Sequence, residues 1–248
     1  MIMEIDKNDF LPGGVTAPKG FKAAGIHSGV KAKNPDLALI VSEVPAVMAG
    51  TFTQNRVKAA PVRLCENRIG SHRGQAIVVN SGNANACTGP EGWRHAELML
   101  QHTADCLKLP VDDVYVCSTG TIGVPLPVDK VLLGIEAASV VLSETGGDEV
   151  SRAIMTTDQG PKSAATTVTI DDAVVTLGIC AKGAGMIEPN MATMLAFITT
   201  DAVVDEDALQ SAVSEVVGRT FNRISVDGDQ STNDTVLCME EARPYPDA

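Results

Sequence analysis

The sequence predicts a layered α/β fold with mixed or antiparallel sheets, and three observations lead to this fold class. The 248 residues are 44% hydrophobic and 20% charged, an ordinary globular balance that can build a sizeable core. Apolar runs of strand length are mixed along the chain with segments of helical periodicity. These runs do not alternate strictly as strand, helix, strand, the pattern typical of a purely parallel sheet. We therefore expect one α/β domain over residues 1–248, without repeats or linkers.

Apolar runs in the first half of the chain are separated by loops of glycine and small polar residues. The predicted elements of this half, after a glycine-rich opening, are a strand at 36–44, a strand leading into a short helix within 52–69, a strand at 76–80 that breaks into a polar loop, a helix at 91–107, a strand at 113–117 that ends in a Thr/Gly loop, and a helix at 128–144. Pro110 stops the first long helix, and Pro127 stands near the start of the second.

The second half is richer in strands. Residues 163–170 and 173–181 flank Asp171-Asp172 and predict a hairpin, and 193–202 predicts a further strand. An amphipathic helix follows, because its apolar residues recur at intervals of three and four: Leu209, Ala212, Val213, Val216 and Val217. Residues 223–240 predict strand, acidic turn, strand. The sequence then passes directly into a Pro-rich polar tail, so we expect the architecture to stop early.

Charge and composition argue against several classes of function. The formal net charge of −12, without a basic run, argues against a nucleic-acid partner. The opening residues lack the charged and apolar regions of a secretory signal, and no apolar stretch reaches the roughly 18 residues of a membrane span. These features predict a cytoplasmic protein without a membrane partner. Its six scattered cysteines form no CxxC motif, so we expect buried small residues rather than disulfides or a metal site.

Five loops combine glycine, hydroxyl and amide residues directly after apolar strands. They are "NSGNANACTG", "CSTGTIG", "MTTDQG", "KGAGMIEPN" and "DGDQSTNDT". Each could simply be a turn, because turns select these residue types. Together they predict a site built on strand ends, because an oxyanion needs unobstructed backbone N–H donors. Thr119 and Gly120 are the best candidates for that role. The motifs GxSxG, HExxH and GxxxxGK[ST] are absent, which argues against a Ser-His-Asp triad or a metal hydrolase.

Thr193 lies between a turn-forming Pro-Asn pair and an apolar strand. A threonine hydroxyl becomes an effective nucleophile when its own free α-amine acts as the base, which requires the threonine to be N-terminal. An internal threonine reaches that state if its hydroxyl attacks the preceding carbonyl and the chain is cut there. The alternative is a simple boundary between loop and strand. From the residues alone, both interpretations of Thr193 stay open.

The segment "KGAGMIEPNMATML", followed by "FITTDA", resembles the self-cleavage segment of the ornithine acetyltransferases, the ArgJ family of glutamate N-acetyltransferases. Other segments of this chain resemble the family in the same order: "GFKAAGIHSGVK", "FTQNRVKAAPV", "VVNSGNANACTG", "CSTGTIGVPLP", "AIMTTD" and "SVDGDQSTNDT". Gln230 stands where the family usually has threonine. The resemblance implies the family's layered α/β/β/α fold, which is related to that of self-processing aminopeptidases.

The resemblance also implies a set of residue roles. The chain would cut itself between Ala192 and Thr193, into an α fragment of residues 1–192 and the start of a β fragment at 193–248. Thr193 would be the nucleophile that carries the acetyl group, with Thr119 and Gly120 as the oxyanion hole. Thr156, Lys182 and Thr193 would bind substrate, and Thr157 is the alternative to Thr156. Without this resemblance, Lys182 would be interpreted as a solvated loop lysine.

The implied activity is ping-pong transfer of an acetyl group from N-acetylornithine to glutamate in arginine biosynthesis, without a cofactor or metal. The α and β fragments would associate, as a heterotetramer, and acetyl-CoA remains open as a second acetyl donor. Family chains continue well past "STNDTVLC" and there supply a substrate-binding glutamate and further polar residues. This chain would then be a fragment or a naturally short member. Two alternatives remain: a self-processing amidohydrolase or aminopeptidase, and a non-catalytic fragment.

Overall fold

The computed structural model describes residues 10–170, 172–187 and 194–241. Its strands and α-helices, in chain order, are β1 (Phe21–Ile26), β2 (Leu37–Phe52), α1 (Ala60–Ile69), β3 (Arg73–Asn83), α2 (Gly89–Leu107), β4 (Val114–Thr121), α3 (Val128–Val140), α4 (Gly147–Ala153), β5 (Lys162–Ile170), β6 (Ala173–Lys182), β7 (Leu195–Thr200), α5 (Glu206–Arg219) and β8 (Thr235–Glu241). Short 3₁₀ turns lie at Gly14–Thr16, Val111–Asp113 and Phe221–Arg223.

Within the described residues, eight strands form one mixed sheet in the order β4-β3-β2-β8-β7-β6-β5, with β1 paired to β2 outside this path. β3 and β4 run parallel, as do β7 and β8, and the other neighbours are antiparallel. The 16-residue strand β2 joins two parts of the sheet. Its first half pairs with β1 and β3, and its second half pairs with β8 and, at Ala46 and Val47, again with β3. A register shift between Val41 and Ala46 separates the two halves.

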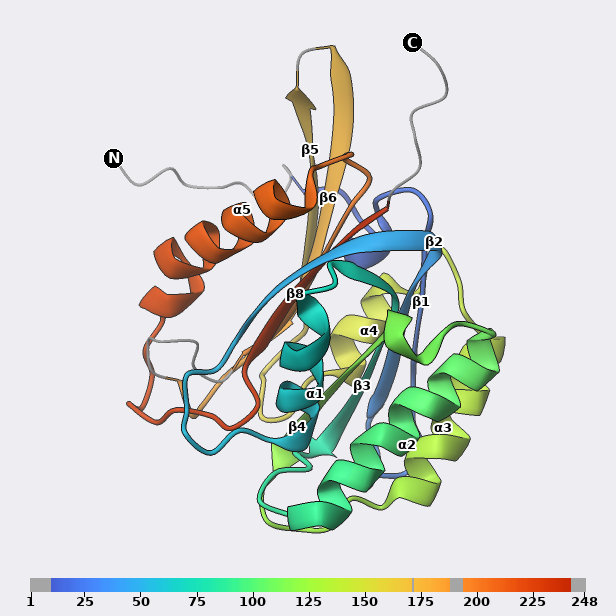
Figure 1. Cartoon of the computed structure of the whole chain (residues 1–248), viewed down its shortest axis with the longest axis vertical. Coiled ribbons are helices and arrows are strands. Elements are labelled where there is room, and N and C mark those ends of the chain that lie inside the picture. Colours follow the sequence, from blue (N-terminus) through green and yellow to red (C-terminus); the bar gives the residue numbers. More distant parts are fainter. Residues whose placement is uncertain (1–9, 171, 188–193, 242–248) are drawn as a thin grey trace.

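Helices cover the sheet from two sides, as Figure 1 shows: α5 lies on one side of the strands and the α2–α3 pair on the other. Both α3 and α5 pack against the long strand β2, and α3 also packs against β1. The main core contains side chains from both parts of the sheet, such as Ile77 on β3 and Phe197 on β7. A second cluster joins Leu209 and Val213 of α5 to Val236 of β8. This layered arrangement of a mixed sheet between helices confirms the predicted fold class.

Several local predictions are confirmed. α2 ends at Leu107, where Lys108 adopts a left-handed conformation two residues before Pro110. α5 begins where the Asp205 carboxylate accepts hydrogen bonds from the backbone N–H groups of Asp207 and Ala208. β5 and β6 form the predicted antiparallel hairpin, although Asp171 in its turn lies outside the described residues.

The helix expected over 128–144 is wrong at its end. α3 stops at Val140, and Ser143 instead exchanges two backbone hydrogen bonds with Ala23 on β1. A short helix that the sequence did not indicate, α4, then begins at Gly147. A Cβ atom at Gly146 would lie 2.0 Å from the Ala23 carbonyl oxygen, so this contact requires glycine. Pairing with β1, itself not predicted, therefore ends the helix.

The strand expected at 223–226 is also wrong, because the backbone there is used to hold a loop. The Val226 N–H donates to the carbonyl of Ile187, and the Asp227 carboxylate accepts the N–H groups of Met186 and Ile187. Three predicted strands are longer than expected. The small polar residues after 80 and after 117 continue β3 and β4, because Ser81 pairs with Thr119 in the parallel ladder. The expected strand at 36–44 extends through Phe52.

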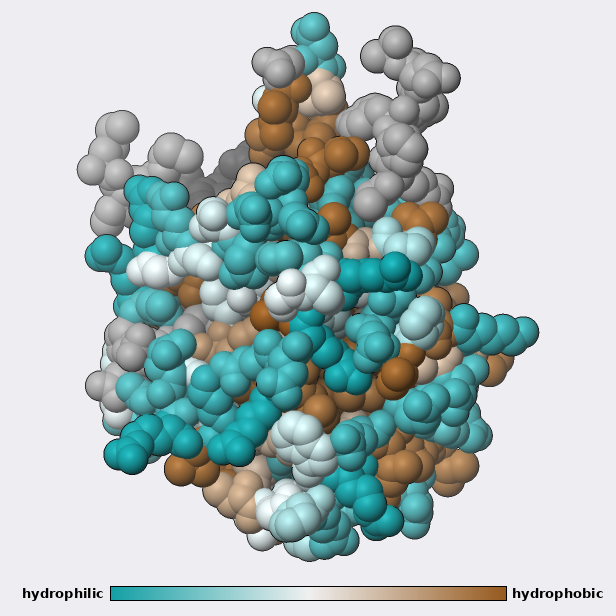
Figure 2. All heavy atoms as spheres, viewed as in Figure 1, coloured by the Kyte–Doolittle hydropathy of each residue, from teal (hydrophilic) through white to brown (hydrophobic). Residues whose placement is uncertain are grey.

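Four of the six cysteines are buried as expected, but Cys106 is half-buried and Cys87 is exposed, and all six are free. The exposed surface also carries apolar residues, most visibly along the projecting β5–β6 arm in Figure 2. Between this arm and α5 lies an apolar groove of about 430 Å³. Its lining includes Leu177 on β6, Ile198 on β7 and Val216 on α5.

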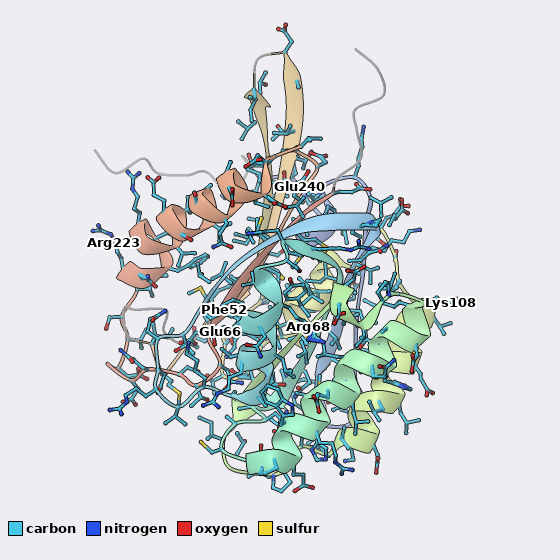
Figure 3. All side chains as sticks on the ribbon, in the orientation of Figure 1. Phe52, Glu66, Arg68, Lys108, Arg223 and Glu240 are labelled. Atoms are coloured by element: carbon cyan, nitrogen blue, oxygen red, sulfur yellow. The ribbon has the colours of Figure 1, made fainter. Side chains whose placement is uncertain are left out.

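Glu240, at the end of β8 (Figure 3), is a carboxylic acid that is only 1% exposed. Burial raises its pKa to about 7; the backbone N–H of Val204 acts in the opposite direction, and the neighbouring Glu241 raises the pKa further. The folded chain therefore holds a proton at Glu240 under conditions in which the unfolded chain has released it. As pH rises from the usual glutamate pKa to about 7, this group removes stability.

We expect Glu240→Gln to stabilise the fold at pH 8 by about 2 kcal/mol, because glutamine needs no ionisation in the buried site. The gain should shrink toward pH 4.5, where Glu240 is protonated in the folded chain. Urea unfolding of both proteins at pH 5 and pH 8 measures the effect, with Glu215→Gln on the exposed face of α5 as the control. Equal stability of wild type and variant at both pH values would contradict the assignment.

Candidate active site

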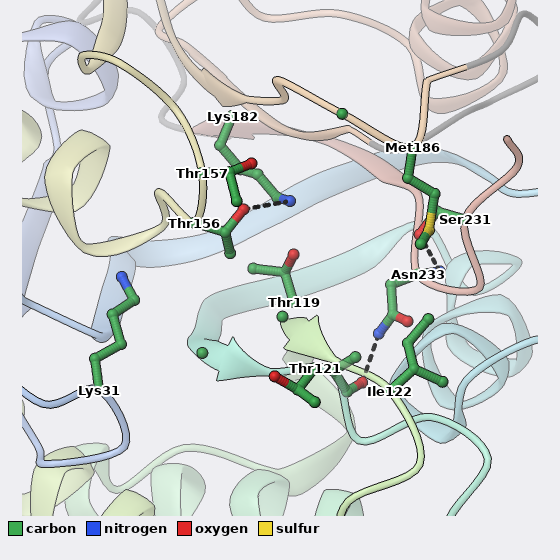
Figure 4. A pocket seen from close by; sticks show the side chains of 14 residues that line it. Lys31, Thr119, Thr121, Ile122, Thr156, Thr157, Lys182, Met186, Ser231 and Asn233 are labelled. Carbon is green, nitrogen blue, oxygen red and sulfur yellow. Dashed lines mark hydrogen bonds between the residues drawn. The ribbon is translucent and has the colours of Figure 1, made fainter. Parts of the chain in front are cut away.

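A cavity of about 500 Å³ lies at one edge of the sheet (Figure 4). β3, β4 and β6 end at this edge, and β7 and β8 begin there, as their registers show. All five polar loops that the sequence indicates contribute to the cavity. Its lining residues are Lys31, Gly82, Ala84, Thr119, Gly120, Thr121, Ile122, Thr156, Thr157, Lys182, Gly185, Met186, Ser231 and Asn233. The structure therefore brings together Thr119, Gly120, Thr156, Lys182 and the alternative Thr157.

Thr119 and Gly120 occupy the end of β4, next to Gly82 on β3. Thr119 is 5% exposed and contributes to the cavity wall. Gly120 has φ of +133°, and a Cβ atom there would lie 2.3 Å from the backbone carbon of Gly82. Only glycine fits this approach of two strands. The backbone at Gly120 thus reaches the cavity without a side chain that could block it.

Asparagine side chains fix the loops around Thr119. The Nδ2 atom of Asn233 donates to the carbonyls of Ala84 at 2.6 Å and Ser118 at 2.9 Å. The Ser118 hydroxyl donates to Oδ1 of Asn80 at 2.6 Å. These bonds join the ends of β3 and β4 to the loop before β8. Because the partners are buried, the network holds the cavity wall in one arrangement.

Lys182, the last residue of β6, is 4% exposed and contributes to the same cavity. Its Nζ lies 3.4 Å from the Thr156 hydroxyl oxygen, to which it donates, as Figure 4 shows. Burial lowers the pKa of Lys182 to about 8, although the carboxylates of Asp158 and Asp234 raise it. Lys182 is therefore mostly charged at neutral pH, in a pocket that shields it from water.

Thr193 and Ala192, the expected nucleophile and cleavage position, lie outside the described residues. The described residues continue from Met194, whose backbone N–H donates to Oδ1 of Asp234 at 2.8 Å. Leu195, the first residue of β7, pairs with Lys182 on one side and with Thr235 on the other. The strand that follows Thr193 in sequence, β7, therefore begins directly beside Lys182 in the sheet.

Lys31 and Asn233 are two of the lining residues that were not predicted individually from the sequence. Lys31 donates from Nζ to the carbonyls of Pro35 and Met155 at 2.8 and 2.6 Å, and its distance to the Ala153 carbonyl is 3.4 Å. A lysine in a glycine-rich loop carries no local signal of such contacts. Asn233 lies within the polar loop "DGDQSTNDT", but the sequence of that loop does not indicate which of its polar side chains points inward.

Other features of the described chain offer less chemistry. The groove beside α5 is lined almost wholly by apolar atoms, so it lacks donors for a charged ligand. No three His, Cys, Asp or Glu side chains gather in metal-binding geometry within the residues that the structure describes. Among those same residues, no helix has both the length and the apolar character needed to cross a bilayer.

Comparisons with known proteins place this arrangement in a family. A sequence profile of the ArgJ family matches residues 22–245. The arginine biosynthesis bifunctional protein ArgJ of Symbiobacterium thermophilum is 53% identical over 234 residues, which cover 93% of this chain and 58% of that protein. This chain therefore spans less than two thirds of that curated relative.

Solved structures agree with the fold. An ornithine acetyltransferase from Mycobacterium tuberculosis, crystallised with ornithine, matches with a TM-score of 0.67 and 44% identity, over 71% of this chain and 95% of that chain. An L-aminopeptidase D-Ala-esterase/amidase of Ochrobactrum anthropi, a variant of the Ntn-hydrolase fold, matches with a TM-score of 0.58 over 96% of this chain and 77% of that chain. At 13% identity, the second match shows a shared fold alone. The profile match and the close relatives show that this chain belongs to the ArgJ family.

Proposed function

We propose that this chain forms the nucleophile-bearing part of a glutamate N-acetyltransferase that moves an acetyl group from N-acetylornithine to glutamate. One observation carries the proposal. Thr119, Gly120, Thr156 and Lys182 line a single cavity, beside the strand that begins just after Thr193. An acyl transfer needs a nucleophile, an oxyanion site and a substrate anchor, and these residues supply the three functions from different loops.

Thr193 acts as an N-terminal nucleophile once the Ala192–Thr193 bond is cut. Its free α-amine, with a pKa of about 7.7–8.0, accepts the hydroxyl proton as the oxygen adds to the acetyl carbonyl of N-acetylornithine. The amide C–N bond then breaks, ornithine leaves with that proton on its nitrogen, and an acetyl ester remains on Thr193. In the second half of the cycle, the α-amine of glutamate attacks this ester, the C–O bond breaks, and the Thr193 hydroxyl regains its proton.

Both tetrahedral intermediates carry a negative oxygen, which Thr119 and Gly120 stabilise at the end of β4. Gly120 suits this role because no side chain lies between its backbone and the cavity. Lys182 and Thr156 bind the α-carboxylate of the substrate, and burial strengthens this ion pair relative to one in water. The protein as a whole is acidic, with a net charge of −12, so a local cation is needed to attract a carboxylate.

A comparison of lengths supports self-cleavage between Ala192 and Thr193. The match to the ornithine acetyltransferase chain from M. tuberculosis covers 71% of this chain and 95% of that chain, so that chain is the shorter of the two. The match to the Symbiobacterium relative covers 93% of this chain but only 58% of that protein, so that protein is much longer than this chain. Two chains cut from one precursor would produce this difference. We further propose that the fragments assemble in the cytoplasm as a heterotetramer and that the remaining family segment completes the site; use of acetyl-CoA is open to the same assay.

Incubation with N-acetylornithine, with and without glutamate, tests the proposal, and the products are followed by mass spectrometry. The protein is this chain alone and this chain extended by the C-terminal part of the Symbiobacterium relative. Formation of N-acetylglutamate in the extended protein is the expected result. Release of acetate without glutamate would instead identify an amidohydrolase. An uncut protein that forms neither product, in both forms, would indicate a non-catalytic fragment. Replacing N-acetylornithine with acetyl-CoA tests the second donor.

A further inference from the structure

Asp158 lies behind Thr156 and Lys182, the two residues proposed to bind the substrate carboxylate. We propose that Asp158 is a positioning residue: its carboxylate joins the segment that carries Thr156 to the strand end that carries Lys182, and so sets the spacing of these two side chains for a substrate carboxylate. The identity of the ligand rests on the proposed function. The contacts that lead to the proposal do not.

One buried carboxylate makes both connections. Oδ2 of Asp158 accepts the Thr156 N–H at 3.1 Å, and Oδ1 accepts the Gly183 N–H at 2.8 Å. Gly183 directly follows Lys182, and the Asp158 side chain is 0% exposed. The Thr156 hydroxyl meets Lys182 Nζ at 3.4 Å. Asp158 therefore holds the backbone on both sides of the contact that the substrate would meet.

No strand ladder makes this connection. β5 begins at Lys162, and its first pair with β6 is Lys162 opposite Ala181. Thr156 lies before β5, and Gly183 lies after β6, so both are beyond the last ladder hydrogen bonds. Asp158 extends the hold of the hairpin to the two residues at its open end. The hydrogen bonds from the Thr156 and Gly183 N–H groups to one carboxylate fix the backbone at both residues.

Lys31 fixes the same segment from its other side. Its Nζ donates to the Met155 carbonyl at 2.6 Å, next to Thr156 in sequence. The Ala153 carbonyl, at the end of α4, accepts the Ser81 hydroxyl at 2.5 Å. The segment that carries Thr156 is therefore held at both ends, by Lys31 and Ser81 on one side and by Asp158 on the other. Thr156 is presented to the cavity from a fixed backbone rather than from a free loop.

The charge on Asp158 adds an electrostatic role. Burial raises the pKa of Asp158, but hydrogen bonds from Lys162, Gly183 and Thr156 outweigh it, so this pKa is lowered overall. The carboxylate is then ionised at neutral pH and favours the protonated form of Lys182. The charged groups that act on Lys182 are Asp158 and Asp234, which raise its pKa, and Lys162 and Lys31, which lower it.

Asp158→Asn tests the proposal, because asparagine keeps the shape but replaces one acceptor oxygen with an NH₂ group that cannot accept a backbone N–H. We expect the dissociation constant for N-acetylornithine at pH 7 to rise about tenfold or more. The apparent pKa of Lys182 should fall, so that binding is lost at a lower pH than in wild type. Calorimetry gives the affinity, and ¹³C NMR of the lysine side chains, assigned with Lys182→Met, gives the titration. Both are measured on this chain alone and on the extended protein.

Lys162→Met is the matched control. It removes the Lys162 side chain, which is 50% exposed and pairs with Asp158. The substitution keeps both backbone hydrogen bonds to Asp158. It also removes a cation that lowers the pKa of Lys182, so the titration should move upward, opposite to that of Asp158→Asn, while the affinity stays within about threefold. A role limited to general folding would not move the two titrations in opposite directions.

The outcomes separate the positioning role from the proposed function. If wild type binds N-acetylornithine and a folded Asp158→Asn protein binds it equally well with an unchanged Lys182 titration, the positioning role is wrong. If Asp158→Asn does not fold, Asp158→Glu keeps the charge but moves the carboxylate away from the Thr156 and Gly183 N–H groups, and wild-type affinity for N-acetylornithine in Asp158→Glu would overturn the positioning role. If the two titrations shift as expected but neither this chain alone nor the extended wild type binds N-acetylornithine, the electrostatic role of Asp158 stands and the proposed function is wrong.

Discussion

Thr193→Ala is expected to give a single uncut chain that transfers no acetyl group, the largest effect predicted for any substitution. The hydroxyl oxygen of Thr193 makes both attacks: first on the Ala192 carbonyl, and after cleavage on the acetyl carbonyl of the substrate. Alanine has no oxygen for either step. The expected loss is therefore complete for cleavage and falls to background for transfer, rather than being a partial reduction.

The test measures intact mass, the new N-terminus and N-acetylglutamate formation. Wild type should yield a fragment that begins "TMLAF", most clearly in the protein extended by the C-terminal part of the Symbiobacterium relative. Thr193→Ser is the matched control, because it keeps the hydroxyl but loses the methyl group that restricts its rotamer, so cleavage should be slower but present. Extended wild type that stays a single chain yet transfers acetyl groups normally would exclude the N-terminal threonine mechanism.

Much of the fold could be predicted because its signals are local. The α5 helix has an apolar residue at every third or fourth position and an aspartate cap, and the β5–β6 hairpin has two strands around a tight acidic turn. The errors occur where a distant strand decides the local structure. Pairing of Ser143 with Ala23 ends α3 at Val140, although the residues that follow, 141–144, are suited to a helix. Likewise, Val226 and Asp227 bond to the loop after β6 rather than to a neighbouring strand.

The candidate site shows the same division. Its loops could be identified because glycine, hydroxyl and amide residues follow apolar strands, and the structure gathers all five around one cavity. The residues that hold those loops could not be identified in the same way. Asn233 bonds to Ala84 across 149 residues, and Lys31 bonds to Met155 across 124. Asp158 is close in sequence to Thr156, but its bond to Gly183 depends on the hairpin between them. Such roles exist only in the folded chain.

Thr119→Val is expected to lower turnover by about two to three orders of magnitude if the hydroxyl of Thr119 is an oxyanion donor. Valine matches the size and branching of threonine and suits the end of β4, so the fold should be kept while the donor is lost. Self-cleavage should slow as well, because the attack on the Ala192 carbonyl passes through its own negatively charged tetrahedral oxygen. KM should change little, because the oxyanion exists only in the transition state and the intermediate.

Two substitutions in the same segment make this result specific. Thr119→Ser restores the hydroxyl and should recover most of the turnover. Thr121→Val removes another hydroxyl from the cavity lining, two residues along β4, where the side chain is exposed. It should leave turnover within about threefold, because an exposed hydroxyl can be replaced by water. Steady-state rates in the extended protein, with self-cleavage followed by intact mass, measure all three variants. If Thr119→Val cuts itself and transfers acetyl groups at the rate of Thr121→Val, the Thr119 hydroxyl is not the donor, and the oxyanion must be stabilised by backbone N–H groups such as that of Gly120. The oxyanion site would then depend on the backbone at Gly120 and not on the Thr119 side chain. Only glycine fits there, because a Cβ atom would lie 2.3 Å from the backbone carbon of Gly82.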